Sequence, residues 1–232
     1  MFHVEHSFSE ALPNSPAALL MEGSLKLGVP CSPHVACRLV LYLKELIRWN
    51  AKVNLTALET EADIISKHFL DSLAAFKLFE GRPGLRILDV GSGAGFPGIV
   101  LKLQAPELSM TLLEPSTKRA AFLHHIVGIL GIIGIKILTV RVEDFTGETF
   151  DLVTCRAIRS EVVLKAAIRL LAPGGRVLLY RVLPLHKSPP NYQITNQIKF
   201  SLPFLNAPRT LILLKRATDS ARSEFTSLIV LP

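Results

Sequence analysis

The residues best suited to chemistry form a glycine-rich stretch at 89–98, Asp-Val-Gly-Ser-Gly-Ala-Gly-Phe-Pro-Gly, which directly follows the strand-like residues Arg-Ile-Leu. Four glycines in ten positions let a ligand approach the backbone closely. A strand, a glycine-rich turn and a helix in succession are the usual setting of a nucleotide site. A Walker A phosphate loop is excluded, because no Gly-Lys-Ser/Thr follows.

Two ligand classes fit the spacing of these glycines. Gly93-x-Gly95-x-x-Gly98 matches the dinucleotide fingerprint, whereas Asp89-x-Gly91-x-Gly93-x-Gly95 matches the loop of S-adenosylmethionine methyltransferases. A pyrophosphate prefers a helix N-terminus without a nearby negative charge, so an acid at the end of the strand favours a ligand with ammonium and sulfonium groups. The loop therefore favours S-adenosyl-L-methionine, with a dinucleotide or another nucleotide-like ligand as the alternatives.

Acidic residues follow two later strand-like runs. Glu114 ends the run Met-Thr-Leu-Leu-Glu, about 20 residues after the glycines, where an acid binds ribose hydroxyls in either ligand class. Val142 and Glu143 follow the run Lys-Ile-Leu-Thr-Val. We expect this pair beside an adenine, which offers an amino group to an acceptor.

An alternating pattern of strands and helices must position these residues. Apolar residues at helical spacing predict helices, and from residue 86 onward short apolar runs also predict strands. Strands are predicted at 86–90, 110–114, 136–140, 150–155, 176–182 and 209–217, and helices at 33–50, 61–79, 97–105, 116–130 and 160–171. Repeated β–α alternation is typical of a mainly parallel sheet with helices on both faces. We expect an N-terminal helical extension over 1–80 and a Rossmann-like domain over 81–232.

Composition limits the classes of protein to consider. Hydrophobic residues make up 49% of the 232 residues, enough for a packed core. Cys31, Cys37 and Cys155 are scattered, which argues against a disulfide framework or a zinc site and favours a reducing cytoplasm. The longest apolar stretch, 126–135, is far shorter than the ~20 residues of a membrane span, and the first residues lack a signal-peptide pattern.

Charge is distributed unevenly along the chain. Residues 1–151 carry 14 Lys/Arg and 16 Asp/Glu, whereas residues 152–232 carry 12 and 3. The basic second part predicts a polyanion partner on a surface to which it contributes, the alternative being a solvated basic face.

Six motifs occur in order along the chain and, in combination, resemble one family. They are RWNAKVNLTAL (48–58), HFLDSL (68–73), LDVGSGAGFPGI (88–99), LLEPSTKRAAFL (112–123), VRVEDF (140–145) and CRAI (155–158). The chain resembles, over residues 39–180, the bacterial 16S (small-subunit) ribosomal RNA guanine-N7 methyltransferases, once named glucose-inhibited division protein B. The resemblance implies a class I S-adenosylmethionine-dependent methyltransferase fold with seven strands. It also implies a cytoplasmic enzyme that acts on 16S ribosomal RNA or the small ribosomal subunit, and we expect a monomer without a metal.

The resemblance also implies roles for particular residues. Nine residues are expected to line the cofactor pocket, among them the acid of the glycine loop and the acid that binds ribose. They are Asp89, Gly91, Gly93, Gly95, Phe96, Glu114, Val142, Glu143 and Arg156. Candidates beside the reacting base are His68, Asp71 and Ser72. RNA-binding candidates are Lys118, Arg119, Arg141, Asn50 and Asn54. The resemblance weakens at YRVLPLHKSPPNYQ (180–193), where the family more usually has Lys-Gly after the strand.

The chemistry implied by this family needs no general base. Guanine N7 has an in-plane lone pair and carries no proton, so catalysis is expected from positioning and charge stabilisation. Asp89, Glu143 and Asp71 are expected to balance the positive charge. Arg141, Arg156, Lys118 and Arg119 are expected to anchor phosphates. Three alternatives remain: a methyltransferase with a small-molecule or protein substrate, a nicotinamide-dependent oxidoreductase, and a non-catalytic RNA-binding protein.

Overall fold

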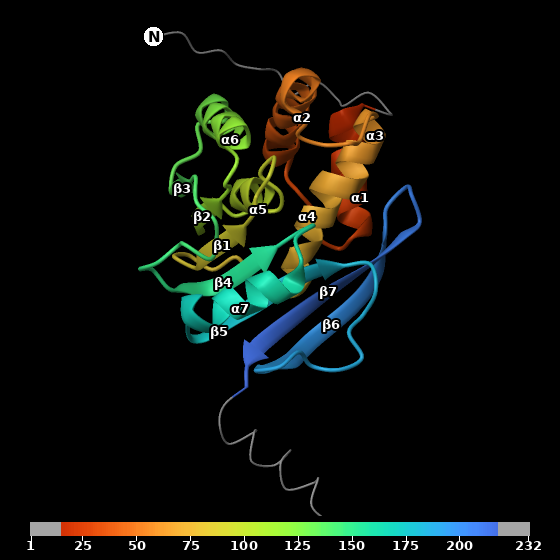
Figure 1. The fold of residues 1–232 in the computed structure, drawn as a ribbon. Helices are drawn as coiled ribbons and strands as arrows, with labels where there is room; N and C mark the ends of the chain where they lie inside the picture. Colours follow the sequence, from red (N-terminus) through yellow and green to blue (C-terminus); the bar gives the residue numbers. More distant parts are fainter. Residues whose placement is uncertain (1–14, 218–232) are drawn as a thin grey trace, which may run out of the picture.

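The computed structural model describes residues 15–217, which surround one seven-stranded sheet (Figure 1). The strands are β1 (Arg86–Val90), β2 (Ser109–Leu113), β3 (Ile135–Leu138), β4 (Phe150–Cys155), β5 (Leu171–Arg181), β6 (Tyr192–Leu202) and β7 (Ala207–Arg216). Their order is β3-β2-β1-β4-β5-β7-β6. The first five strands are parallel to one another, and β7 runs antiparallel to both β5 and β6. The predicted mainly parallel α/β fold is thereby confirmed.

The described helices precede the first strand and lie between the strands as far as β5. They are α1 (Pro16–Lys26), α2 (Pro33–Val53), α3 (Glu61–Ile64), the π-helix η1 (Ile65–Leu70), α4 (Asp71–Leu73), the 3-10 helix η2 (Ala74–Lys77), α5 (Gly98–Gln104), α6 (Thr117–Ile129) and α7 (Ser160–Leu170). No described helix is long and apolar enough to cross a membrane.

Local sequence explains how α2 begins and ends. The Ser32 hydroxyl accepts a hydrogen bond from the Val35 amide at 3.2 Å, and Pro33 occupies the first helical position, as helix N-termini prefer. Asn54 ends the helix in the left-handed region with φ of +51°, a conformation that asparagine tolerates better than most residues. The predicted helix is therefore confirmed, with its last turn extended to Val53.

The predicted helix over 61–79 is a continuous helical run with an unusual centre. Its first turn is α-helical, residues 65–70 form η1, and the run ends as a 3-10 turn. A π segment within a helix is rare and is frequently found at functional sites. Here it carries Lys67 and His68, which are described below.

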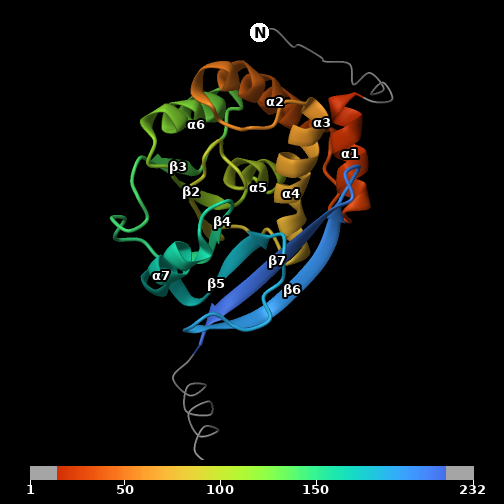
Figure 2. The same ribbon diagram turned by 45° about the vertical axis from the view of Figure 1, so that its right-hand side comes forward.

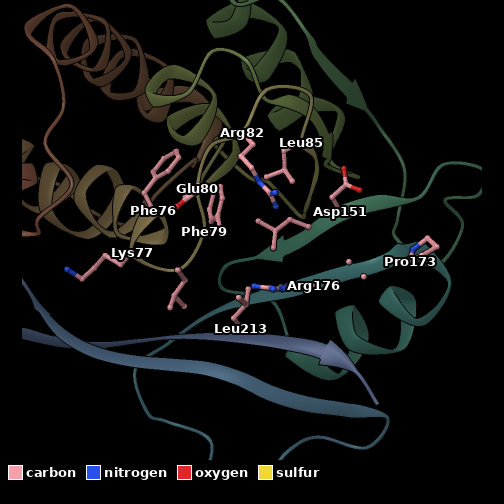
Figure 3. A pocket seen from close by; sticks show the side chains of 14 residues that line it. Phe76, Lys77, Phe79, Glu80, Arg82, Leu85, Asp151, Pro173, Arg176 and Leu213 are labelled. Carbon is pink, nitrogen blue, oxygen red and sulfur yellow. The ribbon is translucent and has the colours of Figure 1, made fainter. Parts of the chain in front are cut away.

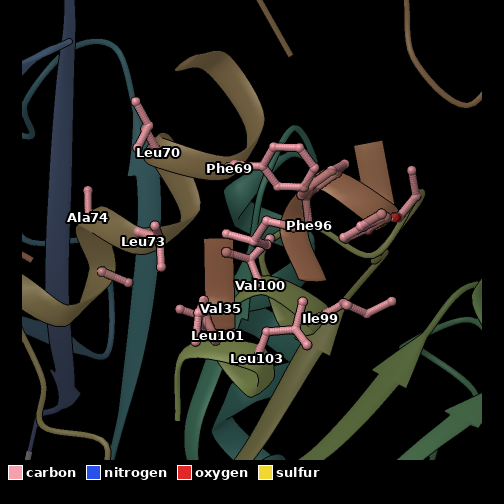
Figure 4. Packing of buried hydrophobic residues seen from close by; sticks show 14 of the residues in the cluster. Val35, Phe69, Leu70, Leu73, Ala74, Phe96, Ile99, Val100, Leu101 and Leu103 are labelled. Atoms are coloured by element: carbon pink, nitrogen blue, oxygen red, sulfur yellow. The ribbon is translucent and has the colours of Figure 1, made fainter. Parts of the chain in front are cut away.

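Helices cover the two faces of the sheet unequally (Figure 2). One core cluster joins α1, α2, α5 and α6 to one face of the strands, with Tyr42, Phe69 and Phe122 fully buried at its centre. Figure 4 shows how residues of α2, η1, the glycine loop and α5 interdigitate there. On the other face, α7 is the helix that contributes to the second cluster. The N-terminal helices thus share a core with the sheet, and the predicted boundary at 80/81 stays a prediction.

One strand was missed by sequence reasoning. Among the described strands, β6 pairs with β7 alone and forms one edge of the sheet, and its residues are mostly half-buried or exposed. Polar residues such as Gln193, Asn196 and Gln197 hide the alternation that marks a strand with one buried face. The segment 182–191 connects β5 to β6 without a helix.

The cysteines in the described range are free thiols. No group of three or more metal-ligating side chains occurs between residues 15 and 217.

Candidate functional site

The glycine loop follows β1 at the carboxyl edge of the sheet. Gly91, Gly93 and Gly95 have φ of +65°, +57° and +93°, conformations that residues with a Cβ adopt at a cost of about 1–2 kcal/mol each. The Ser92 carbonyl accepts hydrogen bonds from the amides of Gly95 (2.7 Å) and Phe96 (3.0 Å). The spacing of the glycines therefore reflects a backbone turn that only glycine forms without strain.

Close packing also requires glycine at positions 91, 95 and 98 of the loop. A Cβ on Gly91 would overlap the Cδ1 atom of Ile158, which belongs to the loop after β4. A Cβ on Gly98 would overlap Leu112 and lie 2.8 Å from Asp89 Oδ2. The glycine loop is thus pressed between its own strand, β2 and the loop after β4.

Asp89 is the buried acid at the end of β1. Its Oδ2 atom accepts a hydrogen bond from the Gly98 amide at 3.0 Å. Within the described residues, Oδ1 is buried and has no hydrogen-bond partner, and such atoms in native proteins are usually completed by water or a ligand. Burial raises the pKa of Asp89 to about 6, against the Gly98 amide and the Ser92 hydroxyl, which lower it. A ligand with an ammonium group fits this acceptor.

Glu114 connects the end of β2 to the glycine loop. Its Oε2 accepts a hydrogen bond from the Gly93 amide at 2.8 Å, and its Oε1 accepts one from the Ser116 amide at 2.9 Å. The side chain is buried. Each carboxylate oxygen can accept a second hydrogen bond, so both remain able to bind the ribose hydroxyls expected there.

The pair at 142–143 lies in the loop after β3, where Val142 is buried and Glu143 is exposed. The Arg169 guanidinium, from the last turn of α7, donates hydrogen bonds to the carbonyls of Val142 (2.6 Å), Glu143 (3.0 Å) and Phe145. Sequence reasoning missed Arg169, because nothing in a helical pattern shows which loop its side chain meets.

Arg156 is the centre of a polar cluster beneath the glycine loop. Its guanidinium donates to the Lys67 carbonyl (2.9 Å), to His68 Nδ1 (2.8 Å) and to Asp71 Oδ2 (3.4 Å), and its side chain is 13% exposed. It also lies 5.0 Å from the centroid of the Phe96 ring, a distance typical of cation–π contact. Its guanidinium is engaged by side chains and a carbonyl of the same chain, and its predicted role as a phosphate anchor stays a prediction.

His68 is held as a neutral imidazole. A guanidinium only donates hydrogen bonds, so His68 Nδ1 must accept, and Nε2 carries the proton toward the Thr56 hydroxyl at 2.8 Å. Burial, and secondly the Arg156 charge, lower the pKa of His68 to about 3. The ring stacks on Phe96 with centroids 4.6 Å apart. His68 thus ties η1 to the glycine loop.

Asp71 and Ser72 are buried just after η1. Asp71 faces two cations, Arg156 and Arg209, the latter at 3.5 Å between Nε and Oδ1. Burial nevertheless raises the pKa of Asp71, against the charges of both arginines, which lower it. The Ser72 hydroxyl donates to the His68 carbonyl at 2.6 Å, within the helical run. The structure therefore brings His68 and Asp71 together around Arg156, whereas the Ser72 hydroxyl is turned to its own helix.

The five RNA-binding candidates divide into two groups. Asn50 is used inside the chain: its carboxamide binds the amides of Leu55 and Thr56 and the Thr56 carbonyl, which places the Thr56 hydroxyl at His68. Asn54 is the left-handed residue that ends α2. Asn54 is exposed, as are the three basic candidates Lys118, Arg119 and Arg141.

The opposite pKa shifts of His68 and Asp89 predict opposite dependences of stability on pH. Because the pKa of His68 is depressed in the folded state, its contribution to stability is fully present above about pH 6.5 and is lost as pH falls. The free energy of unfolding should drop by about 2 kcal/mol between about pH 7 and about pH 5. The raised pKa of Asp89 gives stability that is lost as pH rises through about 6, so acidification restores about 1 kcal/mol over the same range.

Chemical denaturation at both pH values measures these contributions. We expect His68→Gln to be less sensitive to acid than the parent chain, and Asp89→Asn to be more sensitive. Parallel stability–pH curves for the two variants would contradict both assignments.

Comparison with known proteins places this site in a family. The family model for rRNA small subunit methyltransferase G matches residues 36–212. Proteins named ribosomal RNA small subunit methyltransferase G are similar over most of their length. The one from Nitrosococcus oceani is 37% identical, with 87% of this chain and 96% of that protein covered. The one from Caldanaerobacter subterraneus subsp. tengcongensis is 32% identical, with 85% and 89% covered.

Solved structures resemble the fold at low sequence identity. MtNAS, crystallised in complex with MTA and tNA, aligns with a TM-score of 0.55 and 16% identity over 85% of this chain and 78% of that one. TrmN from Thermus thermophilus aligns with a TM-score of 0.53 and 19% identity over 66% of this chain, which spans about half of TrmN (53%). The seven-stranded sheet and these neighbours establish a class I S-adenosylmethionine-dependent methyltransferase fold. With its matched glycine loop and the extent of these similarities, the chain belongs to the rRNA small subunit methyltransferase G family.

Proposed function

We propose that this protein transfers a methyl group from S-adenosyl-L-methionine to N7 of a guanine in 16S ribosomal RNA. The observation that carries the proposal is the glycine loop, whose buried acid Asp89 keeps one carboxylate oxygen without a partner among the described residues. Membership of the family directs this site to ribosomal RNA. The N7 position comes from the resemblance of the sequence motifs.

Residues at the ends of three strands, β1, β2 and β3, would hold the cofactor. Asp89 offers a buried acceptor for the ammonium group, and Glu114 offers its remaining lone pairs to the ribose hydroxyls. The loop at 142–143 would border the adenine, fixed in place by Arg169. When bound, S-adenosylmethionine supplies a methyl group on a positively charged sulfur.

The protein's contribution to the reaction is positioning and electrostatics. The N7 atom of guanine has no proton to remove, so a general base is unnecessary, and the neutral, fully engaged His68 suits a structural rather than a proton-transferring role. The Arg156 cluster fixes Phe96 and with it the exit of the glycine loop. Ordering reactants in this way supplies a large share of rate acceleration in many enzymes.

Two ligands separate this proposal from a nicotinamide-dependent oxidoreductase. A ligand that binds the folded state alone raises the melting temperature, by an amount equivalent to about 2.7 kcal/mol at 100 times its Kd. We expect S-adenosylhomocysteine to raise the melting temperature and NADH to leave it unchanged. Incorporation of a labelled methyl group into 16S ribosomal RNA then tests the acceptor, and stabilisation by NADH alone would contradict the proposal.

A further inference from the structure

Helices α2 and α6 pack side by side in antiparallel directions (Figures 1 and 2). Near one end, the Arg38 guanidinium of α2 donates to the Leu130 carbonyl that follows α6. Further along, Glu45 Oε2 lies 2.6 Å from His125 Nε2, and the Trp49 ring packs on Phe122 with centroids 5.6 Å apart. Progress along α2 thus corresponds to movement back along α6.

Helical periodicity extends this contact line to two lysines. Lys52 lies three residues after Trp49 on α2, and Lys118 lies four residues before Phe122 on α6, so each shares the face of its helix that makes the contact. Both lysines are exposed. Among residues 15–217 neither has a hydrogen bond or ion pair with another side chain.

A shallow groove of about 510 Å³ lies beside Lys52. It is lined by Arg48, Trp49, Lys52, Val53 and His125. Glu45 is the one acidic residue in α2, and α6 has none. That carboxylate is shared by Arg48 (3.3 Å) and His125 (2.6 Å), so the groove and its surroundings present positive charge.

This basic surface leads to the glycine loop from both helices. Three residues beyond the end of α2, the Thr56 hydroxyl binds His68, whose ring stacks on Phe96. At the start of α6, the Ser116 amide binds Glu114, which also binds the Gly93 amide. The lysines at this end of the two helices therefore lie at the same edge of the sheet as the loop.

We propose that this surface, which we call the α2–α6 seam (Arg48, Trp49, Lys52, Lys118 and His125), binds the phosphate backbone of the RNA that presents the methyl acceptor. The inference rests on the proposed function and assigns the RNA backbone a binding path on the protein surface. Lys52 and Lys118, which have no acidic partner among the described residues, are repelled by the cations near them, and phosphates relieve that repulsion. The slightly acidic balance of residues 1–151 conceals the seam, because α2 contains one acidic residue and α6 contains none.

The position of the protein's single tryptophan gives a direct readout. Trp49 lies in the groove, so deproteinised 16S ribosomal RNA should change its fluorescence on binding. We expect Lys52→Ala/Lys118→Ala to weaken this binding on the order of tenfold at moderate salt. The plot of log affinity against log salt concentration should become less steep by about 1.4–1.8, the value for two lost phosphate contacts.

Two arginines at the far edge of the sheet serve as the matched control. Arg82 and Arg176 line a cavity beside the starts of β1, β4 and β5, at the edge opposite the glycine loop (Figure 3). Arg82→Ala/Arg176→Ala removes the same charge, and we expect its affinity and salt slope to equal those of the parent chain. S-adenosylhomocysteine should stabilise all three proteins equally.

The outcomes separate the seam from the enzyme's function. If the lysine variant and the parent have equal RNA affinity and equal salt slope, the proposal that the seam binds RNA is overturned. If both nevertheless transfer the methyl group, the proposed function stands. A defect seen with small ribosomal subunits but absent with deproteinised RNA would assign the seam to a ribosomal protein, and would also overturn the proposal. Absence of RNA binding and methylation by the parent chain would instead refute the proposed function.

Discussion

Replacing Arg156 by alanine is expected to lower the free energy of unfolding by about 3 kcal/mol, the lower end of the range for breaking a buried ion pair. The substitution removes one of the two cations that face the buried Asp71 and the donors to His68 and the Lys67 carbonyl. Arg209 remains at 3.5 Å from Asp71, which keeps the loss from being larger. Because Phe96 loses the cation over its ring, methyl transfer should fall as well.

An exposed pair of the same chemistry provides the control. Arg86 and Asp151 form an ion pair at 3.2 Å at the surface, where such pairs contribute little. Arg86→Ala should therefore change the denaturation midpoint far less than Arg156→Ala. Equal effects of the two substitutions would show that the Arg156 cluster does not hold the fold together. Arg156→Lys, which keeps the charge but not the fork of donors, should recover only part of the loss.

Gly91→Ala is expected to reduce affinity for S-adenosylhomocysteine by 100-fold or more, about 3 kcal/mol or more of binding free energy. The new Cβ would require a left-handed conformation and would overlap Ile158. The loop must then move, and the movement displaces the turn between Asp89 and Gly93. Calorimetric titration measures the affinity, and the unliganded melting temperature checks that the chain is folded.

Gly174→Ala separates strain from overlap. Gly174 also has a left-handed backbone, with φ of +75°, but a Cβ there would meet no atom within 4 Å. This variant should lose about 1 kcal/mol of stability and retain full affinity for the cofactor analogue. If Gly91→Ala retains it too, the close contact between Gly91 and Ile158 is not needed for binding. Partial recovery in Gly91→Ala/Ile158→Ala would identify the overlap as the cause.

The sequence predicted the elements whose residues have one strong periodicity. Strands such as β1 and β4 are short apolar runs, and α2 has both a capping serine and a regular apolar stripe, so local pattern sufficed. The π-helical centre at 65–70 could not be predicted, because the apolar stripe of a helix does not show which carbonyl accepts the hydrogen bond of each backbone amide. The edge strand β6 was missed because polar residues occupy much of it.

The site was predictable where backbone geometry dictates residue type. The local sequence explains the glycines at positive φ and the acid at the end of β1. It does not explain the Arg156 cluster, which joins Thr56, His68 and Asp71 across about 100 positions of chain. Likewise Asn50 matched a motif, yet its carboxamide proved to shape the loop that carries Thr56. Long-range side-chain networks of this kind need the fold before they can be assigned.

The most direct test of the central claim is to identify the base that the protein methylates. The protein is incubated with S-adenosylmethionine carrying a labelled methyl group and with 16S ribosomal RNA or small ribosomal subunits that lack the modification, and the labelled nucleoside is identified by mass spectrometry. The proposed function predicts one N7-methylguanine at a single position, and much weaker labelling by Gly91→Ala. A label on another base, on a ribose or on a protein would contradict the proposed reaction, even if the cofactor binds as expected.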